Sequence, residues 1–476
     1  MRNFILFLLF VISPVFGDAK TNYEVNDVSI RGDSTLMNMR IESSYFADGA
    51  FLVETTGARF EYVKGQLKLY QGLSKSNRRL LSTITFKNEP NFIKVEDNND
   101  HIILWSKDLN IGIYGDSTCI IAPKVDIAMN CRGNFKPDYE GRYEGELLLI
   151  DDKGGMEIYP QRYEKGYDIK NIELGKSDWV ADYELNVGER VMIAAFPGKE
   201  FDWEASFKSN IVINSAGFDK SKSPFQAGIL PSNSLLTQWS GFFNIVILFY
   251  NSAYKNRQPG GPYDVANEAE YKRVVQIAHA NGMKVATYSS LFYWYVDYGK
   301  TADSYMTEIQ NLKSKYNIDG VYIDGLTFDQ YKKIDNKIIN WETVRRLRQL
   351  FGPQGIIVLH GTHLGSATST TPNLESYCTM TLTGEGVKFK DANDPYVQYQ
   401  VRKYGISNTV GSWITYSTPD VLTTRQITDA LIKMNGRIWY SEYDFTQKKS
   451  TDFAYYLQQL ETLRQAYLFQ SKLEKK

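Results

Sequence analysis

The sequence predicts an α/β fold in which a (β/α)8 barrel of the TIM type follows an all-β sandwich. From about residue 20 to 175, short alternating runs are separated by turn signals, which is typical of a sandwich. After about residue 185, short apolar runs alternate with helical patterns, as in a parallel barrel. A chain of 476 residues, 43% of them hydrophobic, is long enough for both units. We expect a signal peptide at 1–17, the sandwich at 18–185 and the barrel at 186–476.

The N-terminus has the pattern of a secretory signal peptide. Met1-Arg2-Asn3 is a basic start, Phe4 to Phe16 is almost wholly apolar, and the small Gly17 follows. No apolar segment reaches the roughly 18 residues that a membrane-spanning helix needs. We therefore expect a secreted or extracytoplasmic protein with no integral membrane segment after signal removal. A retained signal anchor is the alternative.

Composition excludes some classes of partner. The formal net charge of -1 provides no electrostatic attraction to nucleic acid or to anionic membranes. The chain contains 33 Tyr, 25 Phe and 8 Trp, side chains that suit sugar rings and equally suit a protein core.

Cys119 and Cys131 could close a small loop in the β-rich region, which would leave Cys378 as an odd buried thiol.

In the sandwich region, the runs at 60–63, 66–70 and 144–150 alternate between apolar and polar residues, as half-buried strands do. Asp97-Asn98-Asn99-Asp100 and Asp152-Lys153-Gly154-Gly155 are turn signals between such runs.

In the barrel region, we expect eight parallel strands. They lie at 190–196, 244–250, 284–289, 320–324, 355–360, 377–383, 406–411 and 437–441. Helical patterns lie between several of them, at 268–280, 302–316, 340–350 and 425–434. Asn281-Gly282 and Gly352-Pro353 are typical of helix ends. The helix after the first strand, at 201–209, has only a modest pattern.

The carboxyl ends of the strands in such a barrel meet at one face, which is where active sites lie. The fourth strand is the apolar run Val321-Tyr322-Ile323, and it ends at Asp324 before Gly325. The strand ends combine carboxylates, imidazoles and aromatic rings, a mixture that suits carbohydrate chemistry. These side chains belong to Tyr250, Tyr288, Trp294, Asp324, His360, His363, Glu385, Trp413, Glu442 and Asp444.

Two of these carboxylates form the predicted catalytic pair. Glycosidic cleavage needs one carboxylate to attack or stabilise an oxocarbenium-like state and a second to protonate the leaving oxygen. We assign these roles to Asp324 and to Glu385, which lies between two glycines that allow a close approach of the backbone. Glu442 and Asp444 compete with Glu385. In the structural alternative, Asp324 caps a loop and Glu385 sits in a turn. Asp319, at the opposite end of the strand, should be structural.

The remaining strand-end residues are the predicted substrate contacts: Tyr250, Tyr288, Trp294, His360, His363, Trp413 and Glu442. The pattern His360-x-x-His363 can suggest zinc, but no third ligand is evident, so we expect no metal. A structural role is the alternative for His363, and packing beneath a loop is the alternative for the aromatic run at 292–295.

Several short segments together resemble secreted glycoside-hydrolase barrels that follow a β-sandwich, of the α-galactosidase and endo-α-N-acetylgalactosaminidase type. They are Phe201 to Glu204, Asn281 to Val285, Asp319 to Gly325, Val358 to His360 and Thr383 to Glu385. This resemblance implies that Asp324 is the nucleophile and that a later strand-end acid, Glu385, is the acid/base. The Lys-x-Asp signature of α-galactosidases is absent because Tyr322-Ile323 precedes Asp324. The tandem acids of chitinase-like barrels are also missing.

From these observations we predict a retaining glycosidase acting on an extracellular glycan, an α-glycosidase if the resemblance holds. No cofactor is needed, because two carboxylates suffice. The alternative is a non-catalytic carbohydrate-binding protein on the same barrel, since fold does not imply function. An esterase is disfavoured by the absence of Gly-x-Ser-x-Gly.

Overall fold

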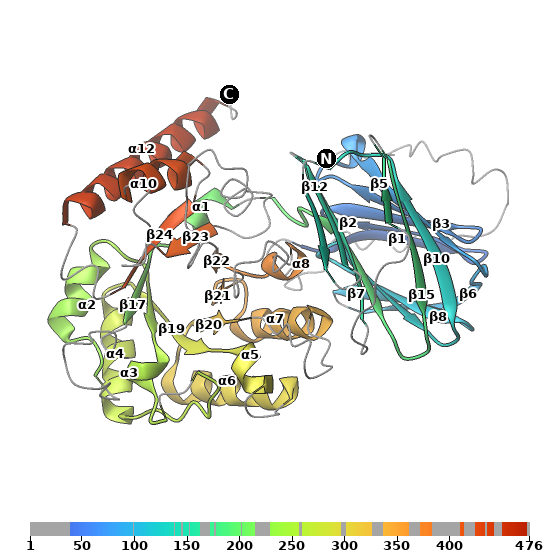
Figure 1. Ribbon diagram of the computed structural model, residues 1–476. Helices are drawn as coiled ribbons and strands as arrows, with labels where there is room; N and C mark the ends of the chain where they lie inside the picture. The colour runs from blue at the N-terminus through green and yellow to red at the C-terminus, as the bar shows by residue number, and fades with distance from the viewer. Residues whose placement is uncertain are drawn as a thin grey trace, which may run out of the picture.

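The computed structural model describes most of the chain and shows two units side by side, an antiparallel β-sandwich and a parallel barrel with helices around it (Figure 1). The described residues are 39–98, 100–137, 139–143, 146–151, 153–161, 172–175, 178–200, 202–214, 229–256, 259–296, 301–325, 337–360, 372–382, 410–413, 424–433, 436–441 and 450–473. The predicted signal peptide lies outside these residues and stays a prediction. No helix in the described part is both long and apolar enough to cross a bilayer.

The sandwich consists of two antiparallel sheets, which confirms the predicted class. In spatial order, the described strands of the first sheet are β1 (Ile41–Ala47), β2 (Ala50–Thr55), β3 (Ala58–Val63), β4 (Gln66–Gln71), β5 (Arg79–Phe86), β10 (Ile127–Gly133), β15 (Trp179–Leu185) and β14 (Ile172–Leu174). Those of the second sheet are β11 (Tyr139–Tyr143), β12 (Glu146–Asp151), β13 (Gly154–Pro160), β16 (Val191–Phe196), β9 (Thr118–Pro123), β8 (Leu109–Tyr114), β7 (His101–Ser106) and β6 (Phe92–Asp97). A single turn of 3-10 helix, η2 (Lys75–Asn77), precedes β5.

Alternation along the strands places one face of each sheet in a shared core. Phe51, Phe60 and Ile84 from the first sheet and Ile111 and Ile193 from the second are buried together in it.

The predicted first barrel strand, at 190–196, is wrong: these residues form β16, which pairs antiparallel with β13 and β9 in the sandwich. All six residues of β16 are buried. Val191, Ile193 and Ala195 lie in the sandwich core, whereas Met192 packs into the core of the barrel. A strand covered on both faces has a continuous apolar sequence, which a parallel barrel strand also has. The last strand of the sandwich therefore lies beyond residue 186, where we expected the barrel to begin.

The barrel is closed by eight parallel strands, and the other seven predicted strands are confirmed within it. In order around the barrel, the described strands are β17 (Ile211–Asn214), β18 (Ile245–Leu248), β19 (Lys284–Ser289), β20 (Gly320–Asp324), β21 (Ile356–His360), β22 (Met380–Leu382), β23 (Val410–Trp413) and β24 (Gly436–Ser441). β17 pairs with both β18 and β24, which closes the barrel.

Helices surround the barrel (Figure 1), and the four predicted helical patterns correspond to α4, α6, α7 and α10. The described helices are α1 (Trp203–Phe207), α2 (Asn233–Ser240), α3 (Tyr250–Ala253), α4 (Glu268–Ala280), α5 (Leu291–Val296), α6 (Ala302–Tyr316), α7 (Lys337–Phe351), α8 (Pro372–Glu375), α10 (Thr424–Lys433) and α12 (Ser450–Leu473). Local signals explain the ends of α6: Thr301 and Ser304 form a capping box, and Asn317 ends the helix in the left-handed region.

The two units meet through α7 and α8, which lie on the side of the barrel that faces the sandwich (Figure 1). On α7, the Trp341 indole donates to Asp116 Oδ2 at 2.7 Å, and Lys337 Nζ lies 2.6 Å from Glu157 Oε1. Arg345 of the same helix bonds to Asp100. These contacts join the barrel to three different strand or turn segments of the sandwich, so the orientation of α7 depends on both units.

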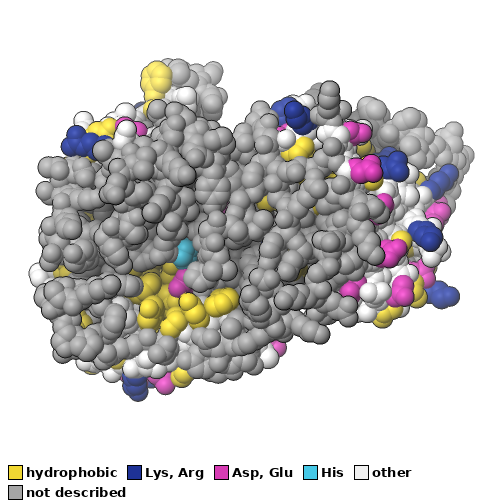
Figure 2. Space-filling view, viewed as in Figure 1, with side chains coloured by type: hydrophobic (Ala, Val, Ile, Leu, Met, Phe, Trp, Pro, Cys, Tyr) yellow, Lys and Arg dark blue, Asp and Glu magenta, His cyan; other side chains and the backbone are white. Residues whose placement is uncertain are grey.

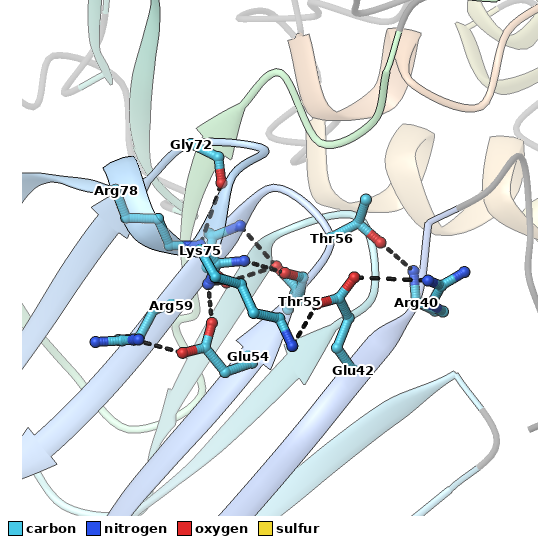
Figure 3. A network of polar contacts seen from close by, with 10 residues as sticks. Arg40, Glu42, Glu54, Thr55, Thr56, Arg59, Gly72, Lys75 and Arg78 are labelled. Carbon is cyan, nitrogen blue, oxygen red and sulfur yellow. Dashed lines mark hydrogen bonds and ion pairs between the residues drawn. The ribbon is translucent and has the colours of Figure 1, made fainter. Parts of the chain in front are cut away.

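A network of charged side chains fixes one edge of the sandwich (Figure 3). Glu54 binds both Arg59 and Arg78, and Arg78 also donates to the carbonyl oxygen of Thr55 at 2.6 Å. These bonds hold the turn between β2 and β3, where Gly57 lies against the segment that leads to the barrel. A Cβ at Gly57 would stand 2.4 Å from the carbonyl oxygen of Pro197, so only glycine fits.

The suggested loop between Cys119 and Cys131 is wrong, because both thiols are free and buried. Cys119 lies on β9 and Cys131 on β10, in opposite sheets of the sandwich, so they are core side chains.

Candidate active site

Asp324 lies at the end of the barrel where the carboxyl ends of the strands meet, the end at which barrel enzymes have their active sites. Asp324 is the last residue of β20, and Gly325 then turns the chain with a φ of 72°, a conformation that favours glycine. Its side chain is 16% exposed, so the carboxylate is mostly buried yet reachable. Figure 2 shows a histidine and an acidic side chain at the border of an apolar patch on the barrel.

Side chains from both neighbouring strands hold the Asp324 carboxylate. Tyr288, on β19, donates its hydroxyl to Oδ2 at 2.5 Å. His360, which is paired with Asp324 in the β20–β21 register, places Nδ1 2.8 Å from Oδ1. Since an ionised carboxylate only accepts hydrogen bonds, the Nδ1–H of His360 is the donor. Each oxygen of Asp324 therefore has a fixed donor, which sets the direction of its remaining lone pairs.

Further contacts hold this cluster in turn. The Tyr322 hydroxyl lies 3.1 Å from His360 Nδ1, and Ser290 Oγ donates to the carbonyl oxygen of Asp324. Burial raises the pKa of the Tyr288 hydroxyl well above its ordinary value, and the charge of Asp324 raises it further. Tyr288 is therefore a neutral donor at any physiological pH.

Aromatic rings line the same side of the barrel mouth. The ring of Tyr250, at the start of α3, is half-buried and lies 4.7 Å from the ring of Tyr288 between centroids. Phe249 packs against Tyr288 at 4.8 Å, and Tyr322 packs against the buried Trp439 at 5.8 Å. Burial, and then the charge of Asp324, raises the pKa of Tyr250. An apolar ring next to a carboxylate is an arrangement that suits a sugar.

The structure brings Asp324, Tyr288 and His360 into direct contact and places Tyr250 beside them. Tyr288 and His360, predicted as substrate contacts, are 0% and 4% exposed, so in this structure they contact Asp324 and are buried from solvent. The main chain of Trp413 pairs with that of Trp439 in the barrel, and its side chain is not described. Four predicted site residues lie outside the described residues: His363, Glu385, Glu442 and Asp444. Their roles stay predictions.

The prediction of a sugar contact for Trp294 is wrong. Its side chain is buried in α5, where its ring stacks on Tyr263 at 5.5 Å and packs edge-on against Tyr305. Its indole N–H donates to the Thr301 carbonyl and to Ser304 Oγ at 3.1–3.2 Å. Trp294 therefore anchors α5 to the start of α6.

Asp319 lies at the opposite end of β20, as expected for a structural residue. Its Oδ2 lies 2.7 Å from His279 Nε2 and accepts the backbone N–H of Val285 at 2.8 Å.

Two contributors to the site were missed in the sequence. Tyr322 is two residues before Asp324 on the same strand, so the period of a strand places both on one face; this signal was available. Ser290 has no such signal, because only the approach of β19 to β20 brings its hydroxyl to the Asp324 carbonyl.

Within the described part of the chain, no group of three or more His, Cys, Asp or Glu side chains could hold a metal ion.

No family model and no curated protein matches this sequence. Several solved structures are similar to the chain at low identity. A GH36 alpha-galactosidase from Geobacillus stearothermophilus, in complex with raffinose, is 9% identical over 89% of this chain and 86% of that one, with a TM-score of 0.44. A GH31 dextranase from Flavobacterium johnsoniae, complexed with glucose, is 9% identical over 89% and 68%, with a TM-score of 0.40. The cycloalternan-forming enzyme from Listeria monocytogenes, in complex with a pentasaccharide substrate, is 8% identical over 89% and 55%, with a TM-score of 0.41. Similarities with such TM-scores carry no argument about activity, and the fold assignment follows from the strand order itself.

Proposed function

We propose that this protein is a retaining glycosidase in which Asp324 is the nucleophile. The observation that carries the proposal is the position of Asp324: a partly exposed carboxylate at the end of a barrel strand, with each oxygen held by a donor from a neighbouring strand. In the proposed reaction, the carboxylate attacks the anomeric carbon and the glycosidic oxygen leaves with a proton from a second acid. Water then cleaves the glycosyl–enzyme ester, and the anomeric configuration is retained.

The second acid is proposed to be Glu385, with Glu442 and Asp444 as its competitors. Retention requires a carboxyl group roughly 5–5.5 Å from that of Asp324. In the sequence, Glu385 follows β22, and Glu442 and Asp444 follow β24. Because parallel barrel strands end at one mouth, these positions are the reason for proposing them as partners of Asp324.

The proposed substrate is a glycan outside the cytoplasm, and the predicted signal peptide is the reason for that location. The resemblance noted in the sequence favours an α-linkage.

The test is Asp324→Asn, assayed beside the unaltered protein on a panel of aryl α- and β-glycosides. We expect kcat to fall by about 1000-fold or more, because the amide is not a nucleophile, with an unchanged thermal unfolding midpoint. Added azide should restore turnover of Asp324→Ala by taking the place of the missing carboxylate. Full activity of Asp324→Asn would exclude the proposed role. Glu385→Gln, Glu442→Gln and Asp444→Asn, made alongside, identify the acid among the three.

A second candidate function is non-catalytic carbohydrate binding. The observation that favours it is that both oxygens of Asp324 are already hydrogen-bonded, which reduces the nucleophilicity of the carboxylate. A binding protein would show no turnover on the panel and would retain affinity for the same sugars.

A further inference from the structure

The aromatic run on α5 is divided by the period of the helix. Leu291 and Trp294 are three positions apart and are buried, whereas Phe292 and Tyr293 lie between them and are half-buried. Phe292 and Tyr293 form an edge-to-face pair, with ring centroids 5.0 Å apart and planes at 86°. We call these two side chains the α5 ledge. The helical period that buries Trp294 leaves Phe292 and Tyr293 partly exposed.

Hydrogen bonds through Ser290 link the backbone of α5 to the backbone of Asp324. Ser290 Oγ accepts the backbone N–H of Tyr293 at 3.2 Å and donates to the carbonyl oxygen of Asp324. The backbone N–H of Ser290 donates to the Tyr263 hydroxyl at 2.8 Å, and this bond also holds the residue that precedes α5. α5 is in contact with β20, the strand that ends at Asp324. The start of α5, from which the ledge projects, therefore has a set position next to the end of β20.

The ledge and Tyr250 both follow the carboxyl ends of neighbouring barrel strands. Tyr250 reaches the mouth from the end of β18, whereas the ledge reaches it from the end of β19. A pyranose ring has an apolar face that packs on an aromatic ring, with hydroxyl groups at its edge for polar contacts.

We propose that the α5 ledge binds a second sugar ring of the substrate, next to the ring attacked by Asp324. The substrate is then an oligosaccharide or polysaccharide rather than a glycoside of a single sugar. This inference rests on the proposed glycosidase function, because Asp324 defines the first subsite. The ledge follows Ser290, which donates to the Asp324 carbonyl, and this position is why we take a sugar as its occupant rather than a protein partner.

The experiment compares two substrates in the full chain. Phe292→Ala and Tyr293→Ala are assayed on the para-nitrophenyl monoglycoside that is hydrolysed best, and on maltotriose, isomaltotriose and raffinose. We expect kcat/KM for the trisaccharide that is cleaved to fall about tenfold, mainly through KM, and the monoglycoside value to change by less than about twofold. Phe242→Ala is the matched control: this half-exposed ring precedes β18, at the opposite end of the barrel, and its loss should affect neither substrate.

Equal losses on both substrates, or no loss on the trisaccharide, would overturn the ledge as a second subsite. If a ledge variant and Phe242→Ala lower the thermal unfolding midpoint alike, the loss of activity reflects packing. This outcome would also count against the ledge as a second subsite.

Calorimetric titration with the same trisaccharides separates failure of the ledge from failure of the glycosidase. We expect the unaltered protein and Asp324→Asn to bind the trisaccharide, and Tyr293→Ala to weaken this binding about tenfold. That result supports the ledge even when no turnover is seen. Absence of trisaccharide binding to the unaltered protein overturns it.

Discussion

Asp324 depends on its neighbours for the geometry that makes it a candidate nucleophile. A carboxylate at the end of a strand can rotate freely unless its oxygens are bound. Tyr288 and His360 remove that freedom, one from each adjacent strand. Because both donors are largely buried, the order they impose is already present before a ligand arrives.

At this scale we predict that Tyr288→Phe lowers kcat by about 10- to 100-fold with little change in KM. The phenyl ring fills the same space, but the donor to Oδ2 is lost, so the carboxylate is less well oriented. Steady-state kinetics on the best aryl glycoside measure this. Tyr316→Phe, at the far end of α6, is the control and should have no effect. An unchanged kcat for Tyr288→Phe would show that the bond does not orient Asp324.

Helix α7 of the barrel bonds to the sandwich at three points. Lys337, Trp341 and Arg345 follow one another at intervals of four residues, which places them on one face of the helix. That face carries the bonds to Glu157, Asp116 and Asp100 of the sandwich. In the sequence, α7 follows β20, the strand that ends at the candidate nucleophile Asp324. The sandwich therefore holds in place a helix that comes shortly after Asp324 in the chain.

Two lysine–glutamate pairs of equal length provide the test at this scale. Lys337–Glu157 and Lys315–Glu268 are both 2.6 Å apart, but the first pair is fully buried and the second is 50% exposed at each partner. Lys337→Met should lower the free energy of unfolding by about 3–5 kcal/mol, because a buried carboxylate loses its partner. Lys315→Met should leave the free energy of unfolding almost unchanged, because solvent screens an exposed pair.

The double variant Lys337→Met/Glu157→Leu should regain most of the loss, since no buried charge remains. Urea titration of each full-length variant measures these values. A double variant as unstable as Lys337→Met would contradict the assignment of the cost to the unpaired carboxylate.

Across the whole molecule, the junction between sandwich and barrel contains two carboxyl groups whose pKa values are shifted in opposite directions. Burial acts to raise the pKa of Asp100, but its hydrogen bond with His101 and the charge of Arg345 outweigh burial and lower it from 3.8 to about 2. Burial raises the pKa of Asp116, despite its hydrogen bonds with Trp341, Thr118 and Tyr377. The junction therefore responds to pH through two opposed groups.

The consequence for stability follows from the sign of each shift. With a folded pKa below the unfolded one, Asp100 stabilises the folded chain above pH 3.8, and this contribution disappears as pH falls through about 2. Asp100→Asn should thus cost ~2 kcal/mol at pH 7 and much less near pH 2.

Asp116 has the opposite sign: its contribution is fully present below its unfolded pKa and is lost as the pH rises toward and through its raised folded pKa. Asp116→Asn should therefore gain stability relative to the unaltered protein as the pH is raised from about 4 to 7. Urea unfolding at a series of pH values tests both variants. Parallel pH profiles for the two would contradict the opposed shifts.

The sequence by itself determined the order of the barrel strands and helices from β18 onward, the limits of α4 and α6, and the position of Asp324 at a strand end. These features depend on local periodicity, helix caps and turn residues, all of which act over a few neighbouring positions. The tertiary structure decided what those signals leave open. β16 has the apolar run of a barrel strand but belongs to the sandwich, because the barrel covers its second face. Trp294 lies in the core, whereas Phe292 and Tyr293 are partly exposed, because α5 turns its Trp294 side toward α6. Tyr288 and His360 reach Asp324 only because their strands are its neighbours in the sheet, and that adjacency is a property of the closed barrel.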